Sequence, residues 1–537
     1  MTTLPSRIMH SRESHGRMRH RSIVVTSVLA ATGLALAACG GSSGGSSSGH
    51  GGSARGGTLT VGTDFSNGSL DPAKADPGTD PLYLDPLYAP LLRFAPNGQL
   101  EGVLAASFGY VGSGNKVFQL TLRPGVKFSN GQPVTGAAVA ASIRHFKTGS
   151  NGGPWLVNCP AVTAPSATRV RISCTRPDPD IAQTLSERLL GGDIVAPASL
   201  AHPATLGTDP IGAGEYTLDA AQTVTGSTYT YVANPRYFDQ KAIHWDKIVV
   251  KYLANASSAL DSLRSGQIQE LWTVDPETLT AAQGDGMPVS SSALGFEGVN
   301  LADRSAGHGN PLGSLKVRQA LEYAVNRPAI VKALYGKSPG AAATDEVAIP
   351  SEPSAYDPAV NNYYPYDPAK ARQLLARAGY PHGFTIKVED QGDTAELTQA
   401  VIGYWNAVGV QAKVTADTTV PGWSSNVLSK KFPAMGFAYG GLPMYMEAIN
   451  FFEPSANIFN PFATNDAQIT GLISAAISAP AAQQNTDFQK IQAAGVQQAG
   501  YLAVTLIPVG LLHAAGVDAP PIDQGYYGND TDVTPAS

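Results

Sequence analysis

Several features are scarce in this 537-residue chain. Asp, Glu, Lys and Arg together make up only 15% of the residues, against a usual share of about 25%. The 36 Lys and Arg are outnumbered by 42 Asp and Glu, which argues against a nucleic-acid binder, because phosphate binding needs concentrated basic side chains. Three cysteines are too few for a disulfide scaffold. The apolar share of 43% nevertheless suffices for a large core, which argues against wholesale disorder.

The amino-terminal segment has the pattern of an export signal. Five arginines between positions 7 and 21 face a single acid, Glu13, and an uncharged apolar run follows from Ile23 to Ala38. This run is shorter than the ~20 apolar residues of a transmembrane helix, and it fits the hydrophobic region of a secretory signal. No second run of about 18 apolar residues follows, so the chain encodes no channel or permease.

The end of this run, Leu36-Ala37-Ala38-Cys39-Gly40, resembles a bacterial lipobox. The resemblance implies that Cys39 becomes the first mature residue and carries the lipid; the alternative is an ordinary signal with an incidental cysteine. We therefore expect a lipoprotein signal peptide over 1–38 and a flexible Gly/Ser tether over 39–57. The protein would then be extracytoplasmic and lipid-anchored to the cell membrane.

Cys159 and Cys174 remain for the folded part. Export would place them in an oxidising compartment, where pairing is the default. A zinc site is the weaker alternative, because no matching His or Cys pair accompanies them. We expect a structural disulfide that clasps a hairpin at roughly 161–175, worth ~3 kcal/mol in the chain-entropy model. The histidines are well separated, so we expect no metal ligand set.

Hydrolase signatures are absent from the folded sequence. No H-E-x-x-H occurs, and G-x-S-x-G matches fall only in the low-complexity tether, whereas a nucleophile elbow needs a strand before it and a helix after it. A secreted hydrolase is therefore disfavoured, and we expect no catalytic residue.

Periodic patterns of helix and strand alternate along the rest of the chain. The pattern predicts a helix after Thr135 as N-cap, helical spacing over 83–94, a turn at Asn97-Gly98 followed by a short helix, and a helix pair joined at Asn326-Arg327-Pro328. Predicted strands include 58–61, 117–122, 228–233, "FTIKVED" and the buried "YLAVTLIPVGLLHA". Such alternation indicates an α/β fold with α+β parts.

These ordered segments resemble the extracellular solute-binding proteins of family 5, the oligopeptide-, dipeptide- and nickel-binding components of ABC importers. The most specific matches are "LRPGVKFSNGQPVTG" and "VRQALEYAVNRPAIV", and the resemblance covers about 58–510. It implies a large, class II periplasmic-binding-protein-like fold whose two lobes are joined by two crossing strands. Lobe I would comprise residues 58–95, 209–298 and 505–537. An extra α+β domain of lobe I would comprise 96–208, and lobe II would comprise 299–504.

The resemblance also implies a function. We expect a substrate-binding protein that captures a small solute, a peptide or modified peptide first of all, and delivers it to ABC permease and ATPase subunits. It would act as a monomer without a cofactor and without nucleic acid. A sensor or cell-wall interaction protein on the same fold is one alternative; import of a sugar, an opine or a metal chelate is another.

Peptide-binding relatives often carry a Trp and an Asp, the Asp for the peptide ammonium, in a segment that resembles 433–452 here; Phe437 and Tyr439 would take the aromatic role. Gly440 and Gly441 stand where the carboxylate is expected, which puts ordinary peptide recognition in doubt. Aromatic residues of this kind are more often core than pocket. The candidate ligand-binding residues are Phe65, Asn67, Trp272, Phe296, Phe437, Tyr439, Met444 and Tyr445, and Trp155 is a further candidate.

Overall fold

A computed structural model describes residues 55–149, 153–305, 309–352, 355–392, 394–417, 419–522 and 528–536. The expected signal peptide, the lipid-bearing Cys39 and all but the last residues of the tether lie outside these ranges. None of the helices in the described ranges combines the length and the apolar character that a membrane crossing requires.

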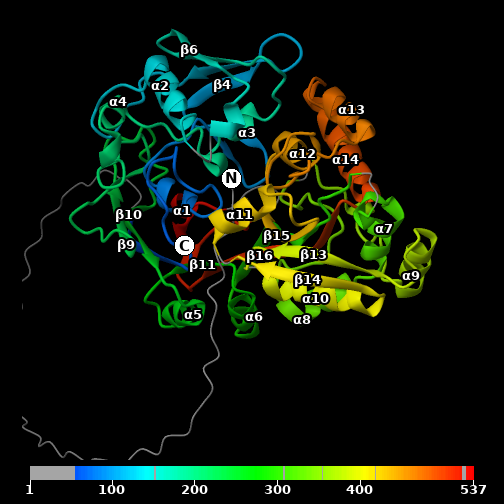
Figure 1. Ribbon diagram of the computed structural model, residues 1–537. Helices are drawn as coiled ribbons and strands as arrows, with labels where there is room; N and C mark the ends of the chain where they lie inside the picture. Colours follow the sequence, from blue (N-terminus) through cyan, green and yellow to red (C-terminus); the bar gives the residue numbers. More distant parts are fainter. Residues whose placement is uncertain are drawn as a thin grey trace, which may run out of the picture. The chain divides into compact units, whose positions relative to one another are not determined.

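A ten-stranded mixed sheet runs through the described residues (Figure 1). Its strands, in spatial order, are β14 (Val410–Ala416), β13 (Phe384–Asp390), β15 (Ala434–Gly440), β12 (Val289–Asn300), β16 (Tyr501–His513), β11 (Glu270–Thr273), β1 (Gly56–Thr63), β10 (Trp245–Tyr252), β9 (Thr228–Ala233) and β8 (Tyr216–Leu218). The central β1 pairs in parallel with both β10 and β11. Strands from distant parts of the sequence thus share one backbone hydrogen-bond network.

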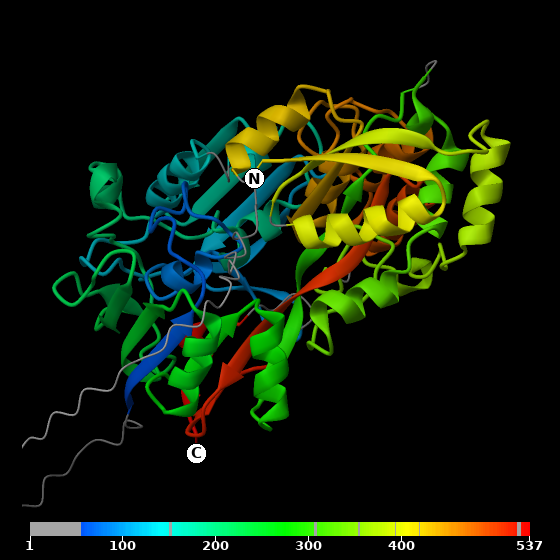
Figure 2. The same ribbon diagram turned by 60° about the horizontal axis from the view of Figure 1, so that its bottom comes forward.

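The two longest strands, β12 and β16, lie antiparallel in the middle of this sheet (Figure 2). Along β12, pairing with β16 starts at Val289 and continues to Asn300, while β15 pairs only from Gly295 onward. Every residue of β16 is buried, as expected for a strand covered on both faces. These strands therefore connect the β15 side of the sheet to the β11 side, and both expected lobe boundaries at 298–299 and 504–505 fall on them.

A second sheet lies in the segment between 96 and 208. Its strands are β4 (Ala105–Tyr110), β5 (Val117–Leu122), β7 (Arg169–Ser173) and β6 (Ala161–Ser166), in that order. Helix α2 (Gly136–Phe146) packs on it, and the Thr135 side chain accepts a hydrogen bond from the Ala138 N–H, so the expected N-cap is confirmed. The expected hairpin is β6–β7, with Cys159 just before it and Cys174 just after it.

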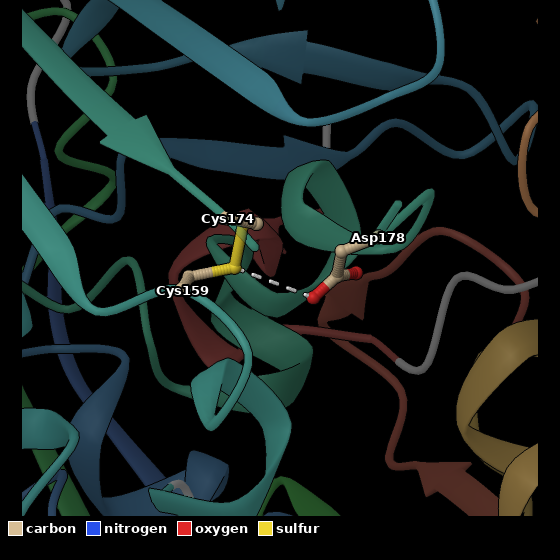
Figure 3. A group of neighbouring side chains, drawn as sticks. All are labelled: Cys159, Cys174 and Asp178. Carbon is tan, nitrogen blue, oxygen red and sulfur yellow. Dashed lines mark hydrogen bonds between the residues drawn. A yellow bond between two sulfur atoms is a disulfide. The ribbon is translucent and has the colours of Figure 1, made fainter. Parts of the chain in front are cut away.

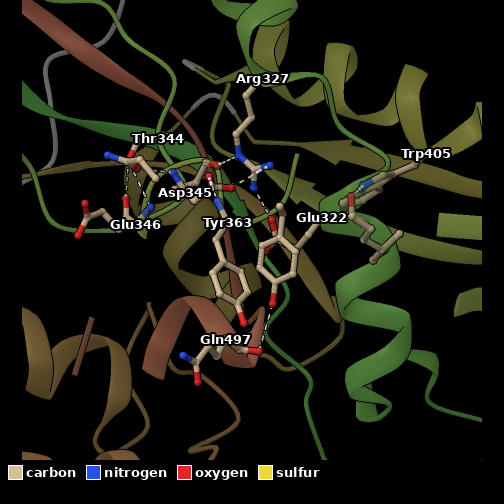
Figure 4. A network of polar contacts seen from close by, with 12 residues as sticks. Glu322, Arg327, Thr344, Asp345, Glu346, Tyr363, Trp405 and Gln497 are labelled. Carbon is tan, nitrogen blue, oxygen red and sulfur yellow. Dashed lines mark hydrogen bonds and ion pairs between the residues drawn. The ribbon is translucent and has the colours of Figure 1, made fainter. Parts of the chain in front are cut away.

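The sequence motif around Asn326-Arg327-Pro328 holds helices against the crossing strands. Helix α7 (Leu315–Tyr323) ends there and α8 (Arg327–Tyr335) begins, with Asn326 capping α8. The buried Arg327 guanidinium pairs with Glu322 and, at 3.2 Å, with Asp345, and it donates to the Ala503 carbonyl of β16 at 2.7 Å (Figure 4). The motif is therefore a packing element in this fold.

Two expectations for residues 83–108 are wrong. Only α1 (Pro81–Leu84) is helical there; β2 (Leu92–Phe94) and β3 (Leu100–Gly102) form a two-stranded sheet. Pro86 and Pro90 explain the short helix, because a proline has no backbone N–H to donate to the carbonyl four residues earlier and its ring clashes with that carbonyl. The short helix expected after Asn97-Gly98 is replaced by β3 and β4, although the turn itself is present and Gly98 has φ 75°.

The remaining elements complete the layers over the sheets. The remaining helices are α3 (Ile181–Thr184), α4 (Pro197–Leu200), α5 (Ala256–Arg264), α6 (Pro276–Gly284), α9 (Pro368–Arg377), α10 (Ala395–Ala407), α11 (Val420–Leu428), α12 (Met444–Phe452), α13 (Ala467–Ala476) and α14 (Ala481–Gln498); the carboxy-terminal strands are β17 (Val517–Asp518) and β18 (Thr534–Pro535). Helices α7 to α10 enclose a core of their own with β12, β13 and β14.

Candidate ligand-binding site

One cavity, here called the central cavity, encloses about 990 Å³ including its open mouth. It is lined by residues from several segments that are far apart in the sequence. They come from the loop after β1 and the adjoining α1, from residues 187–189, from the loop after β15 and from residues 528–530. Trp272, Leu294 and Val509 also line it. The cavity therefore lies where the segments expected to form the two lobes meet.

Two of the residues expected to bind ligand, Phe65 and Trp272, line the central cavity. The Tyr83 hydroxyl donates to the Phe65 carbonyl at 2.6 Å, which fixes the loop after β1. Trp272, in β11, donates its indole N–H to the Glu270 carboxylate at 2.7 Å. Both rings are more than nine-tenths buried, so each offers an edge rather than a whole face to a solute.

The glycines at 440 and 441 also line this cavity, and a side chain at Gly441 has no room. A Cβ there would lie 2.2 Å from Ile349 Cδ1, and 3.6 Å from a terminal guanidinium nitrogen of Arg188. Arg188 is itself buried and forms an ion pair with Glu352. Where the family resemblance predicts a carboxylate, the structure thus has bare backbone beside a cationic group.

Three carboxyl groups also line the cavity, those of Asp85, Glu187 and Asp530. Burial raises the pKa of Glu187 to about 7 and lifts the pKa of Asp85 and Asp530 well above the ordinary aspartate value. Repulsion from neighbouring carboxylates adds to the effect at Asp85 and Asp530. In the absence of a bound cation, these groups hold protons at a pH at which exposed carboxyls are ionised.

A second, aromatic cavity of about 870 Å³ is lined by Trp155, Tyr439, Tyr445 and Asp178, among others. Asp178 Oδ2 lies 3.6 Å from the Cys159 sulfur, and the structure joins Cys159 and Cys174 as a disulfide (Figure 3). Because burial raises the pKa of Asp178 to about 7, a protonated Asp178 can donate to this sulfur. The three side chains form a compact group of potential metal ligands, but sulfurs bonded to each other offer no thiolate to a metal.

Polar contacts join the 96–208 segment to the 299–504 segment around both cavities. The Asp180 carboxylate accepts hydrogen bonds from the backbone N–H groups of Tyr445 and Met446 at 3.0 Å each, at the start of α12. Arg176 pairs with Glu453 at 3.0 Å. The Asn115 amide donates to two carbonyls after α13. Helix α12 has no side-chain cap of its own, so Asp180 caps it from a distant part of the chain.

The other expected site residues lie elsewhere. Phe296 and Phe437 are fully buried, and their rings pack edge to face at 5.6 Å in a cluster with Phe451. They line neither of the two cavities, and neither do Asn67 and Met444. The alternative that aromatic residues of this region form core describes Phe296 and Phe437 well. Binding roles for these four residues remain predictions without geometric support.

Sequence reasoning missed Asp85, Glu187, Asp530 and Asp180. Asp85 lies in the quoted segment "LDPLYAPLLRF", which carries the family resemblance only as a fold motif. Glu187 and Arg188 are on a short 3-10 helix, Glu187–Leu189, with no pattern that marks a site. Only the three-dimensional arrangement brings these charges together.

The strand order, with two long crossing strands between two α/β halves, defines a two-lobed periplasmic-binding-protein fold. A solved structure with this fold is the periplasmic binding protein AgaA of A. tumefaciens R10 in complex with agropinic acid, with a TM-score of 0.72 at 20% identity over 90% of this chain and 99% of the other. The model of the bacterial extracellular solute-binding proteins, family 5 (middle region), matches residues 99–459, more than half of the chain. The chain belongs to this family.

Curated relatives agree with this assignment. A protein of Brucella ovis named as an ABC transporter peptide-binding protein is 31% identical over 264 residues, 47% of each chain. The glutathione-binding protein GsiB of Escherichia coli K12 is 26% identical over 329 residues, 59% of this chain and 61% of the relative. The chain thus spans about half of the length of the Brucella relative and somewhat more of GsiB.

Proposed function

We propose that this protein is the substrate-binding component of an ABC importer and captures a peptide or modified peptide in the central cavity. The observation that carries the proposal is a cavity lined by residues from both sides of the crossing strands, in a chain that belongs to family 5. Relatives named for peptide and glutathione binding support the substrate class. ABC permease and ATPase subunits are the partners, and the protein itself performs no catalytic step.

We further propose that lobe I comprises residues 58–95, 209–298 and 505–537. The extra domain comprises 96–208, and lobe II comprises 299–504. Hinge motion along β12 and β16 would open and close the cavity, a common mode of ligand capture. Closure excludes water, so a few polar contacts suffice to hold a small solute. The contacts of Asp180, Arg176 and Asn115 across the cavities would then belong to the closed form.

We also propose that Cys39 carries a lipid that anchors the mature protein outside the cytoplasmic membrane and that the Cys159–Cys174 disulfide forms after export. The lipobox-like segment and the tether that follows support the anchor. The bonding distance of the two sulfurs supports the disulfide. A Cys39→Ser variant should lose the lipid mass and leave the membrane fraction, whereas a variant of a tether serine should stay there.

Mass spectrometry of solutes released from the denatured, freshly purified protein tests the main proposal. We expect a peptide or modified peptide at up to one molecule per chain, and loss of uptake of that compound in a deletion strain. A bound solute with normal uptake would favour the sensor alternative. An opine or metal chelate in the cavity would uphold solute capture and replace the peptide, an outcome that the missing carboxylate at Gly440 and Gly441 makes worth testing.

A further inference from the structure

The central cavity continues into a smaller one, here called the adjoining cavity, of about 470 Å³. Asp85, Glu187, Gly528 and Asn529 line both, so the two spaces meet at these residues. Among the described lining residues of the two cavities, five are acids and two are arginines. The acids are Asp85, Glu187, Glu215, Asp530 and Asp532; the arginines are Arg93 and Arg188.

Both arginines already have anionic partners. Arg93 pairs with Glu101 at 2.6 Å and with Asp532 at 3.4 Å. Arg188 pairs with Glu352. Both arginines that line the cavities therefore form ion pairs with acids other than Asp85. The lining residues of the two cavities include more carboxyl groups than guanidinium groups.

Asp85 is the group for which this excess matters most. It is only 9% exposed, and within the described part of the chain no hydrogen bond or ion pair to its Oδ1 is found. An ionised carboxylate in such a place is strongly unfavourable unless a cation pairs with it. Among the described residues, Asp85 is thus a buried acid with an unpaired carboxyl oxygen at the meeting point of two cavities, which is what a site for a positively charged group requires.

We propose that the junction of the two cavities, centred on Asp85 with Glu187 beside it, binds an ammonium or guanidinium group of the solute. The inference rests on the proposed function and narrows its substrate class to solutes with such a cationic group. The body of the solute lies in the central cavity against Phe65, Trp272 and Leu442, and its cationic end reaches the junction. Arg188, which follows Glu187 in the chain and also lines the central cavity, has its own anionic partner in Glu352.

Binding then displaces a proton. Burial and the surrounding acids keep Asp85 protonated in the empty protein, and a bound cation stabilises the ionised form. The charged groups that surround this carboxyl are Glu187, Asp193, Glu215, Asp530 and Asp532 among the acids, and Arg93 and Arg188 among the bases. The proton of Asp85 leaves to solvent as the solute's cation takes its place.

Titration calorimetry with matched peptides tests this proposal. The probes are Ala-Lys-Ala against Ala-norleucine-Ala and Ala-Arg-Ala against Ala-citrulline-Ala, each pair differing mainly in the positive charge. We expect at least one cationic peptide to bind tenfold or more tightly than its neutral match. The binding heat at pH 7 should depend on the ionisation enthalpy of the buffer, in the direction of proton release.

Two isosteric variants and one control locate the effect. Asp85→Asn should reduce the preference for the cationic probe to less than threefold and abolish proton release, without lowering the melting temperature, because it removes an uncompensated buried acid. Glu187→Gln should also reduce the preference for the cationic probe over the neutral one. This variant replaces Asp85→Asn as the test if Asp85→Asn does not fold. Asp178→Asn is the control: Asp178 is also buried but lines the aromatic cavity, and the preference should remain.

Equal affinity for charged and neutral probes, or a preference that survives in Asp85→Asn and Glu187→Gln, overturns the cation site. If no probe peptide binds, the chemical structure of the solute found by mass spectrometry tests the cation site instead. A solute without an ammonium or guanidinium group overturns the cation site and leaves solute capture intact. If no solute of any kind is found, the proposed function and this inference fail together.

Discussion

The hydrogen bonds of Asp180 to α12 give a quantitative test of closure. The carboxylate accepts from the N–H groups of Tyr445 and Met446 at 3.0 Å each, and it joins the 96–208 segment to the 299–504 segment. In Asp180→Ala both N–H groups lose their acceptor in a buried place. A buried donor without a partner costs about 1–3 kcal/mol, and loss of a helix cap costs about 0.5–2 kcal/mol.

If these bonds exist only in the closed form, their loss weakens closure and therefore ligand affinity. Water replaces part of the interaction, so we take a net loss of ~1.5–3 kcal/mol, which corresponds to ~10–100-fold in the dissociation constant. The melting temperature of the ligand-free protein should change little. The assay is calorimetric titration with the solute identified from the purified protein, paired with thermal unfolding of the empty form.

The chain offers a matched control. Asp466 accepts from the N–H groups of Gln468 and Ile469 at 2.9 and 3.1 Å and caps α13, the helix that it precedes directly. Asp466→Ala should lower the melting temperature, with a loss of ~1 kcal/mol, and leave affinity unchanged. The reasoning is refuted if Asp180→Ala binds the solute as tightly as the native protein, or if both variants behave alike.

Three further predictions concern the framework. A thiol reagent applied to the unreduced, denatured mature protein should leave Cys159 and Cys174 unlabelled, and reduction should lower the unfolding free energy by ~3 kcal/mol; two free thiols would contradict the pairing. Arg327→Met leaves the Glu322 carboxylate buried without its partner and should cost ~3–5 kcal/mol in denaturant unfolding, whereas Arg327→Met with Glu322→Gln should recover part of the loss. The pKa of Glu187 in the folded protein is about 7, above the ordinary value near 4.3. Between these pH values the folded state binds more protons than the unfolded state, so the free energy of unfolding should fall as pH rises from about 4 through 7. A melting temperature of the empty protein that rises over this range would contradict the buried, protonated state of Glu187.

The extent to which the fold follows from the sequence differs between segments. Strands β9 and β13 coincide with the alternating or apolar runs that predict them, and Thr135 caps α2 as its residue type favours. These are local effects, set by side-chain period and capping. The segment 83–108 fails because prolines shorten the helix and because Leu100–Gly102 pairs with β2, a tertiary contact that overrides local preference.

The site is less predictable, for a physical reason. Phe65 and Trp272 line the central cavity, and they lie beside strands whose ends the family resemblance locates. Phe437 was expected in the same role, but pairing of β15 with β12 turns it into the aromatic core around Phe296. Tyr439, two residues further and on the same face of β15, packs in this cluster and also lines the aromatic cavity, so the period of a strand does not distinguish core from cavity.

The charges around the cavity support a single interpretation of the missing carboxylate. Gly441 cannot be replaced by Asp without displacing Ile349, and Arg188 occupies the adjacent space. A ligand ammonium at that place would meet a guanidinium instead of an acid. The acids that line the cavity, Asp85 above all, are unfavourable for the empty protein, since buried carboxyls without cations lower stability. Residues that cost stability and have no structural partner are characteristic of functional sites. Under the proposed function, Asp85 would then take the role of the missing carboxylate, and capture of a cationic peptide would not need an acid at Gly440 or Gly441.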